Sequence, residues 1–348
     1  MKLVHVGGGL GNQIADYFNY LVVKRNNPND EIYIETMTYD IPEMGKIVST
    51  WNGYELEKVF GLQLPNIKSK FQNDEFQLLE KEIQDTKFWE KSWTPRVEFC
   101  KALNNHGYNF KIEGNGEIAK ENSNIKEKLI GNVKTYLTTE SSNVISYYFK
   151  RFIWKMKYSF NTNNSRPNFG LYTADNVYYA PTFSTIKSSL LLDEILPEFR
   201  STLRFSNPTD NRNLSALHNI TNQNSVSLHA RRSDYLQYNN DCYKYGYFKR
   251  AVNYIKRYID EPVFYIFSED CGWCENHTDV FGLSESDNLI FVDWNTGVNS
   301  FRDLQLMANC KNNIITKSSF GYIACLLNSY PQKITISQIS DYQTTIHL

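Results

Sequence analysis

The sequence has no long hydrophobic run. Its longest purely apolar stretch is of the kind found at residues 322–327, whereas a membrane-spanning helix needs about 20 such residues. Residues 1–6 form one strand-length segment before a run of glycines, which is too short for the apolar core of a secretion signal. We therefore expect a cytoplasmic protein without a transmembrane helix.

An excess of charge of one sign is also absent. The 348 residues include 37 Lys and Arg against 38 Asp and Glu, for a formal net charge of −1. Such a balance provides no broad positive field for a polyanion. It argues against nucleic-acid binding and suggests that any adjacent basic residues serve local chemistry.

Cysteine is scarce and its spacing completes no known site. With no signal sequence, the six cysteines are expected to be reduced thiols. Cys271 and Cys274 have C-x-x-C spacing, but no second such pair and no paired histidines complete a tetrahedral zinc site. An acidic D-x-D pair is missing as well. We therefore expect no metal and no cofactor.

The dinucleotide-binding fingerprint is incomplete. Read from Gly7, G-x-G-x-x-G requires glycine at position 12, where the chain has Asn12. This counts against a nucleotide-dependent oxidoreductase, although Glu35 ends a predicted strand where such enzymes carry a ribose-binding acid. The glycine loop at residues 7–13 still allows close approach of a ligand to the backbone. Asn12 is then either a ligand contact or the N-cap of the following helix.

An anion-binding pattern is present at residues 226–235. Alternating residues predict a strand that ends at His229 and is followed by Arg231, Arg232 and Asp234. Arginine binds phosphate bidentately and keeps its charge at any working pH. Two adjacent side chains on extended backbone point in opposite directions, so we assign the phosphate to Arg231 and supporting roles to Arg232 and Asp234. The alternative is a surface salt-bridge cluster.

Strand and helix patterns alternate through the carboxyl half of the chain. The predicted strands end at His229, 263–267, 289–292, 313–316 and 333–337, with helical patterns at 247–258, 301–310 and 319–328 between them. Alternation of this kind predicts an α/β fold with a parallel, doubly wound sheet. Right-handed crossovers then collect the carboxyl ends of the strands, so His229, Ser268 and residues 316–319 should line one crevice.

The amino half begins with the same alternation and then becomes less clear. It has a predicted strand at 2–6, a helix at 12–25 and a strand at 31–35. We expect an amino-terminal α/β domain at 1–215 and a carboxyl-terminal Rossmann-like domain at 216–348. Residues 144–160 interleave bases with aromatics. They predict either a peripheral membrane-surface helix or a helix packed on the amino-terminal domain, and we favour the second.

Four motifs occur together in one order. The chain has GGLGNQ at residues 8–13, HARRSDY at 229–235, FSED at 267–270, and DLQLM at 303–307 followed by SSF at 318–320. Together they resemble the bacterial α-1,2-fucosyltransferases of glycosyltransferase family 11. The resemblance implies a GT-B-like fold in which two Rossmann-like domains face a central crevice. It covers most of the chain, from residue 8 to residue 320.

The resemblance also implies a reaction and its partners. The expected donor is GDP-β-L-fucose, and the expected acceptor is the 2-hydroxyl of a terminal β-galactoside, with inversion to the α-linkage. A site of this kind works without a metal, because arginine stabilises the departing nucleotide diphosphate. A non-catalytic GDP-sugar-binding or glycan-binding protein is the alternative, since the general base is not identified. Asp16, Asp234 and a water relay are the candidates.

The family's motifs assign donor-binding roles to residues of this chain. His229 should lie beside the guanine, Arg231 should bind phosphate, and Asp303 should accept hydrogen bonds from the Watson–Crick edge of guanine. For Asp303 the alternative is a capping role at the start of its helix. Lys317 and residues 321–323 depart from the family's usual NSSFSWW. The remaining predicted donor contacts are Gly9, Gly11, Asn12, Arg232, Ser268, Ser318, Ser319 and Phe320.

Overall fold

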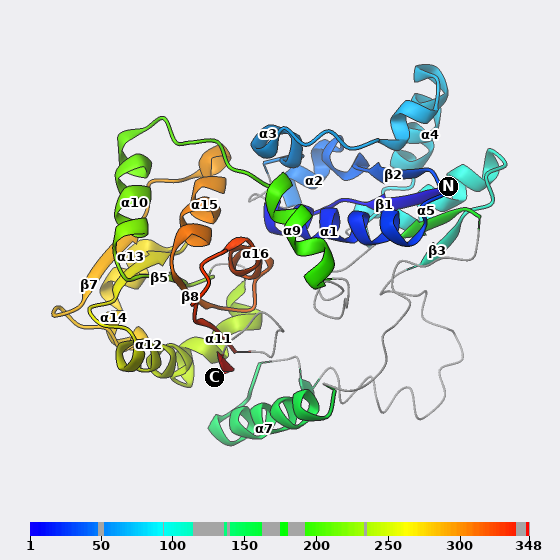
Figure 1. The fold of residues 1–348 in the computed structure, drawn as a ribbon. Helices are drawn as coiled ribbons and strands as arrows, with labels where there is room; N and C mark the ends of the chain where they lie inside the picture. The colour runs from blue at the N-terminus through cyan, green and yellow to red at the C-terminus, as the bar shows by residue number, and fades with distance from the viewer. Residues whose placement is uncertain are drawn as a thin grey trace. The chain divides into compact units, whose positions relative to one another are not determined.

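Parallel strands interleaved with helices form two α/β units in a computed structural model of the chain (Figure 1). The structure describes residues 1–47, 52–92, 94–113, 136–137, 140–161, 175–179, 192–232, 235–338 and 346–347. Unit 1 comprises Met1–Lys120 and Arg166–Ser206, and unit 2 comprises Glu121–Ser165 and Asn207–Leu348. The predicted α/β class with parallel sheets is confirmed, and with it the two-unit organisation of a GT-B-like fold.

Unit 1 contains a four-stranded parallel sheet of order β2-β1-β4-β3. Lys2 of β1 pairs with Ile32 of β2 and with Val177 of β4. The strands are β1 (Lys2–His5), β2 (Ile32–Glu35), β3 (Lys111–Glu113) and β4 (Val177–Tyr179). The α-helices are α1 (Leu10–Asn26), α2 (Pro42–Ile47), α3 (Leu56–Phe60), α4 (Asn73–Asp85), α5 (Arg96–Asn105) and α9 (Leu192–Thr202).

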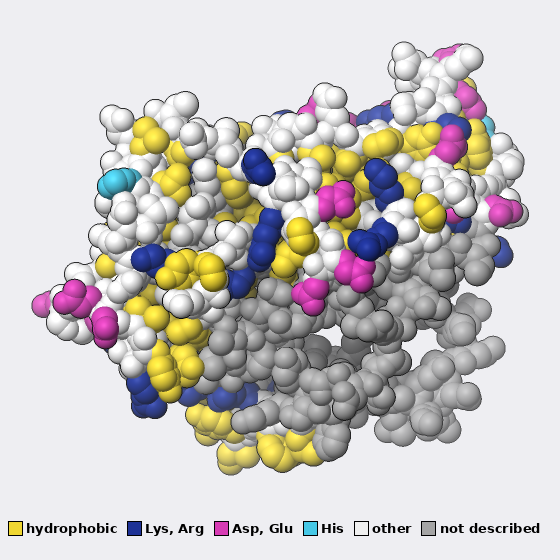
Figure 2. All heavy atoms as spheres, in the orientation of Figure 1, with side chains coloured by type: hydrophobic (Ala, Val, Ile, Leu, Met, Phe, Trp, Pro, Cys, Tyr) yellow, Lys and Arg dark blue, Asp and Glu magenta, His cyan; other side chains and the backbone are white. Residues whose placement is uncertain are grey.

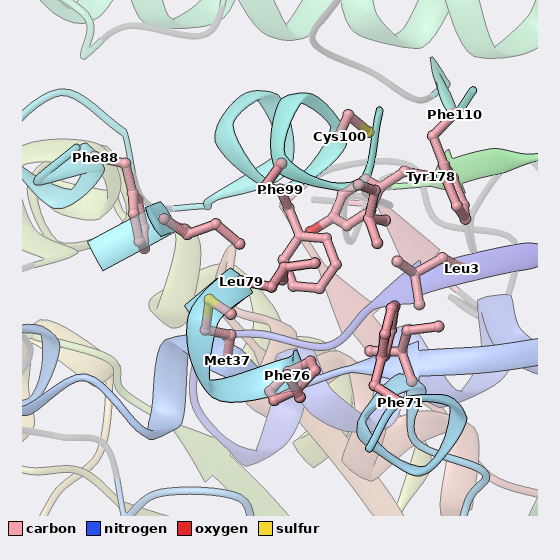
Figure 3. Packing of buried hydrophobic residues seen from close by; sticks show 14 of the residues in the cluster. Leu3, Met37, Phe71, Phe76, Leu79, Phe88, Phe99, Cys100, Phe110 and Tyr178 are labelled. Atoms are coloured by element: carbon pink, nitrogen blue, oxygen red, sulfur yellow. The ribbon is translucent and has the colours of Figure 1, made fainter. Parts of the chain in front are cut away.

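The sheet of unit 1 is buried on both faces. Leu3 and Tyr178 pack with Leu79 of α4 and Phe99 of α5, where the rings of Phe99 and Tyr178 lie 5.7 Å apart (Figure 3). Val4 is also fully buried and points to the opposite face, since successive strand residues alternate. Both faces of the central strand are therefore covered.

Unit 2 contains a six-stranded parallel sheet of order β10-β9-β8-β5-β6-β7. Its strands are β5 (Ser225–His229), β6 (Val263–Phe267), β7 (Asn288–Val292), β8 (Asn312–Ile315), β9 (Thr335–Ser337) and β10 (Ile346–His347). The chain runs from β5 outward through β6 and β7, then returns to the other side of β5 as β8. The gap between β5 and β8 is therefore the topological switch point, where open α/β sheets bind ligands.

Helices cover both faces of the second sheet (Figure 1). Leu228 and Ile266 pack with Val252 of α12 on one face, and Asn313 donates to the Ser227 hydroxyl and to the Met307 carbonyl of α15 on the other. The helices of unit 2 are α7 (Val144–Asn161), α10 (Asn211–Asn222), α11 (Leu236–Lys244), α12 (Tyr247–Tyr258), α13 (Cys271–Asn276), α14 (Thr278–Phe281), α15 (Phe301–Asn309) and α16 (Ser319–Leu327).

Two features of the organisation differ from expectation. A boundary after residue 215 would cut α10, whereas the compact units divide after Ser206. Helix α7 groups with unit 2, so the expectation that it packs on the amino-terminal domain is wrong. Its Tyr147 stacks on Tyr245 instead, with ring centroids 4.8 Å apart.

None of the described helices is long and apolar enough to cross a membrane.

Candidate functional site

The carboxyl ends of β5, β6 and β8 bring most of the predicted site residues of unit 2 together. His229 is the last residue of β5 and pairs in register with Phe267 at the end of β6. The next residue, Ala230, donates its N–H to the Phe267 carbonyl and accepts from the Ser268 hydroxyl at 2.7 Å. Ser268 therefore fastens the two strand ends to each other, beside the switch point.

Arg232 is a buried structural arginine. Its guanidinium lies 3.3 Å from the centroid of the Trp273 ring, and its Nε donates to Asp270 at 3.1 Å. Its backbone N–H donates to the Glu269 carboxylate at 2.6 Å. The Arg232 side chain is therefore engaged within unit 2, in keeping with the supporting role expected of it.

Arg231 has the opposite environment. Its side chain is 21% exposed, and its guanidinium is 3.7 Å from Glu269 and 5.3 Å from the Tyr235 ring. The Tyr243 hydroxyl donates to the Arg231 carbonyl at 2.9 Å and so fixes the backbone. The two arginine side chains point in opposite directions, as alternation along extended backbone requires. Arg231 presents the accessible charge of the pair.

His229 is buried, and its Nδ1 has no hydrogen-bond partner among the described residues. Burial, aided by the nearby charge of Arg231, lowers the pKa of His229 to about 3. The imidazole is therefore neutral at physiological pH. The Thr316 hydroxyl, just after β8, is likewise buried without a partner in the described part of the chain. Buried polar atoms rarely stay unsatisfied, so both are suited to a ligand.

The start of α16 faces the same strand ends. Phe320 lies 5.9 Å from the His229 ring, and a Cβ at Gly321 would come within 2.7 Å of His229 Nδ1. Glycine at this departure from the family pattern therefore makes room for the histidine. Ser318 occupies the N-cap without a side-chain capping bond, while Ser319 is half-buried. The first N–H groups and the positive end of the helix dipole favour an anion here.

Asp303 lies in the first turn of α15 and accepts a hydrogen bond from Asn295 Nδ2 at 2.8 Å. Burial raises the pKa of this carboxyl to about 7, while the Asn295 bond works in the opposite direction. The Ser300 side chain makes no capping bond at the helix start. The predicted capping pattern is therefore not realised, and Asn295 holds the Asp303 carboxyl instead.

A chain of amides supports Asp303. Asn295 and Asn213 exchange hydrogen bonds of 2.8 and 3.0 Å, and Asn213 donates in turn to Asp210 at 2.9 Å. Trp294 Nε1 also donates to Asn213 at 2.9 Å. We name Asp210, Asn213 and Asn295 the amide relay. Sequence reasoning missed it, because 82 residues separate the two asparagines and neither belongs to a matched motif.

The glycine loop of unit 1 is held from within that unit. Gly8 has φ +78°, and its carbonyl accepts from Gln13 and from the Tyr39 hydroxyl. The N-cap of α1 is Gly9, so the capping role considered for Asn12 is wrong. Asn12 is exposed in the first turn of the helix, while Gly11 is buried.

Asp16 is committed to this loop. Its carboxylate accepts the Gly7 N–H at 3.0 Å, and burial raises its pKa well above the ordinary value. It is enclosed inside unit 1 rather than facing a crevice, so it fixes the turn. The other predicted carboxylate, Asp234, lies outside the described residues.

Glu35 is also occupied internally. Its carboxylate accepts from His5 Nδ1 at 2.7 Å, from the Tyr178 hydroxyl at 2.8 Å and from the Met37 N–H. All of this cluster is buried. A ribose would find no open carboxylate there, which weakens the oxidoreductase alternative further. Among the described residues no group of three or more His, Cys, Asp or Glu side chains has a metal-binding arrangement.

Comparison with known proteins identifies related sequences. The model of the family described as Glycosyl transferase family 11 matches residues 125–345, more than half of the chain. An α-1,2-colitosyltransferase from Escherichia coli is 34% identical over 119 residues, 33% of this chain and 40% of that protein. The O-antigen biosynthesis glycosyltransferase WbnK from the same species is 30% identical over 164 residues, 44% of this chain and 53% of that protein.

More distant similarities involve fucosyltransferases. Galactoside alpha-(1,2)-fucosyltransferase 1 from Saimiri sciureus is 27% identical over 107 residues, 29% of this chain and 28% of that protein. The chain thus spans about half or less of the length of these relatives. The crystal structure of NodZ alpha-1,6-fucosyltransferase soaked with GDP-fucose aligns over 96% of this chain and 94% of its own, with TM-score 0.42 and 10% identity.

Proposed function

Because the chain belongs to glycosyltransferase family 11, we propose that it transfers L-fucose from GDP-β-L-fucose to the 2-hydroxyl of a terminal galactoside, with inversion to the α-linkage. The observation that carries the proposal is the set of groups that follow the strands of the unit 2 sheet. Arg231 and the start of α16 suit a diphosphate, while Asp303 suits a base edge that donates two hydrogen bonds. His229 and Thr316 supply buried polar atoms beside them.

Asp303 accounts for the choice of nucleotide base. A carboxylate accepts from the paired N–H donors of guanine, whereas adenine presents an acceptor there and is repelled. Hydrogen bonds to the charged form of an acid favour that form. Guanine binding should therefore lower the pKa of Asp303 from about 7 and stabilise the carboxylate at neutral pH.

Arg231 accounts for the leaving group. As the bond between the sugar carbon and the diphosphate oxygen breaks, negative charge grows on the diphosphate. A fixed guanidinium and helix N–H groups stabilise that charge without reorganising. The acceptor oxygen attacks from the opposite side of the sugar, and its proton passes to Asp234 or to a water relay.

A second donor is supported by one similarity. The relative with 34% identity is named for colitose transfer, and colitose is the 3-deoxy counterpart of L-fucose. Both sugars would arrive as GDP-sugars in the same site. The relative named for O-antigen biosynthesis supports a bacterial surface glycan as the acceptor.

The test is GDP release measured with and without a β-galactoside such as lactose. GDP-fucose, GDP-colitose, GDP-mannose and UDP-galactose are compared at equal concentration. We expect acceptor-dependent release from GDP-fucose at least about tenfold faster than from GDP-mannose or UDP-galactose, and analysis of the product should show an α-1,2 linkage. A faster rate with GDP-colitose would change the donor but keep the reaction.

Two outcomes would contradict the proposal. Tight GDP binding without release from any sugar nucleotide would favour a non-catalytic GDP-sugar-binding protein. Absence of GDP binding altogether would remove the basis for assigning Asp303 and Arg231. The Arg231→Ala variant serves as the control for contaminating hydrolases, because release that survives this change does not come from the site.

A further inference from the structure

Helix α7 carries an apolar stripe that faces solvent. The stripe consists of Ile145, Tyr148, Phe149, Phe152 and Met156, whose exposed fractions run from 43% for Met156 to 78% for Ile145. Their spacing of three, one, three and four residues places them on one side of a helix. Figure 2 shows hydrophobic side chains gathered where α7 lies in Figure 1, at the lower edge of the view.

The stripe stands out from the rest of the described surface. Twelve large hydrophobic side chains are exposed there, and six of them belong to α7, these five and Val144. Single exposed apolar residues are normal, but a contiguous set marks an interaction surface. The stripe therefore needs a partner that covers it.

The opposite side of α7 is fastened to unit 2. Tyr147 stacks on Tyr245, and Arg250 donates to the Tyr147 hydroxyl at 2.9 Å. Just before the helix, the Ser141 hydroxyl and N–H both donate to the Asp241 carboxylate, the hydroxyl at 2.7 Å. The stripe faces outward because the inner face is already packed.

The charge of α7 indicates what covers it. Its sequence contains four basic residues, Lys150, Arg151, Lys155 and Lys157, and no acidic residue, in a chain whose net charge is only −1. Lys150 is buried and donates to the Glu140 carbonyl at 3.3 Å, so it belongs to the packed side of the helix. The Arg151 guanidinium lies 5.6 Å from the ring of Tyr148, at the border of the stripe. A guanidinium beside exposed aromatics, on a helix without acidic residues, complements an anionic lipid surface, where aromatic rings lie at headgroup depth and bases contact phosphates.

We propose that α7 is an interfacial helix that places the stripe on an anionic lipid bilayer. The helix lies in the plane of the interface, in keeping with the finding that no described helix can span a membrane. Membrane binding through the stripe does not depend on the proposed sugar transfer. Its chemistry suits an enzyme whose acceptor is anchored in lipid.

The experiment is co-sedimentation of the whole protein with unilamellar vesicles. One set contains phosphatidylglycerol and phosphatidylethanolamine, and the other contains phosphatidylcholine alone. The test variant is Ile145→Ser with Phe152→Ser. The matched control is Leu78→Ser with Tyr258→Ser, which removes two side chains that are 65% and 59% exposed elsewhere. Circular dichroism and a thermal melt show that each variant is folded.

We expect the wild type and the control to bind the anionic vesicles. The stripe variant should bind them at least about tenfold more weakly, because each aromatic or aliphatic side chain withdrawn from water raises the binding affinity about tenfold. Binding should weaken at high salt, since salt screens the bases. Equal binding by the stripe variant overturns the proposal. So does a wild-type dimer that binds no vesicles and dissociates in the stripe variant, which would make the stripe an interface between two copies.

Discussion

At the scale of single residues, we expect the two adjacent arginines to have different roles, Arg231 in catalysis and Arg232 in stability. We expect Arg231→Ala to lower turnover on the order of 10²–10³-fold, as loss of a charged transition-state stabiliser does, with little change in melting temperature because its side chain is partly exposed. Steady-state kinetics and a thermal melt measure the two effects. Arg232→Ala should lower the melting temperature more than it lowers turnover, since its guanidinium is packed on Trp273. Wild-type turnover in Arg231→Ala would exclude the phosphate role.

Asp303 makes nucleotide binding depend on pH. Its raised pKa of about 7 means that the free site holds a protonated carboxyl below that pH, which accepts poorly from guanine. GDP affinity should therefore rise as pH increases from 6 to 8, and Asp303→Asn should bind GDP more weakly with a flat pH profile. Calorimetric titration across this range measures both. A variant that loses melting temperature but keeps wild-type GDP affinity would mean that Asp303 is only structural.

At the scale of elements, the amide relay connects α10 to the start of α15. Asn213→Ala removes the partner of Asn295, which then loses its fixed orientation toward Asp303. The Asn295 bond lowers the pKa of Asp303, so a looser bond should move the pH midpoint of GDP binding upward. GDP titration at several pH values tests this, with exposed Asn222→Ala on the same helix as the control. An unchanged midpoint in Asn213→Ala would show that the relay only packs α10 on α15.

Most longer helices and strands could be predicted from the sequence, but the surfaces against which they pack could not. Helix α12 and strand β6 follow directly from hydrophobic periodicity, which depends on neighbouring residues alone. The short strands β3, β4 and β10 have two or three residues each and offer no period to detect. The packing of α7 was mispredicted because an aromatic face does not specify which aromatic surface it meets.

At the scale of the whole molecule, we expect sugar transfer to proceed without a metal ion. In the function proposed above, Arg231 and the N–H groups at the start of α16 offset the diphosphate charge. The nearby carboxylates Glu269 and Asp270 are paired with the two arginines. Turnover in excess EDTA should stay close to that in Mg²⁺ or Mn²⁺. Loss of most activity on chelation, restored by Mn²⁺, would direct attention to Glu269 and Asp270 as ligands.

The sequence alone determined the class of fold and the edge of the sheet at which the candidate site residues lie. Strand ends in a parallel sheet gather on one side whatever the details of packing, so His229, Ser268 and Ser318 could be placed together from their positions after strands. The ordered motifs indicated the family, and three of their segments, HARRSDY, FSED and SSF, begin at or just after the ends of β5, β6 and β8.

Only the tertiary structure decided what each side chain does there. It turned Asp16 inward to hold the glycine loop, buried Arg232 against Trp273 and joined Asn213 to Asn295 across 82 residues. It also buried His229 Nδ1 away from every hydrogen-bond partner in the described part of the chain. Each of these outcomes depends on burial and on contacts between distant segments. Local patterns in a sequence do not specify burial or contacts between distant segments. The desolvation and hydrogen bonding that determine each side chain's role arise only when the chain packs.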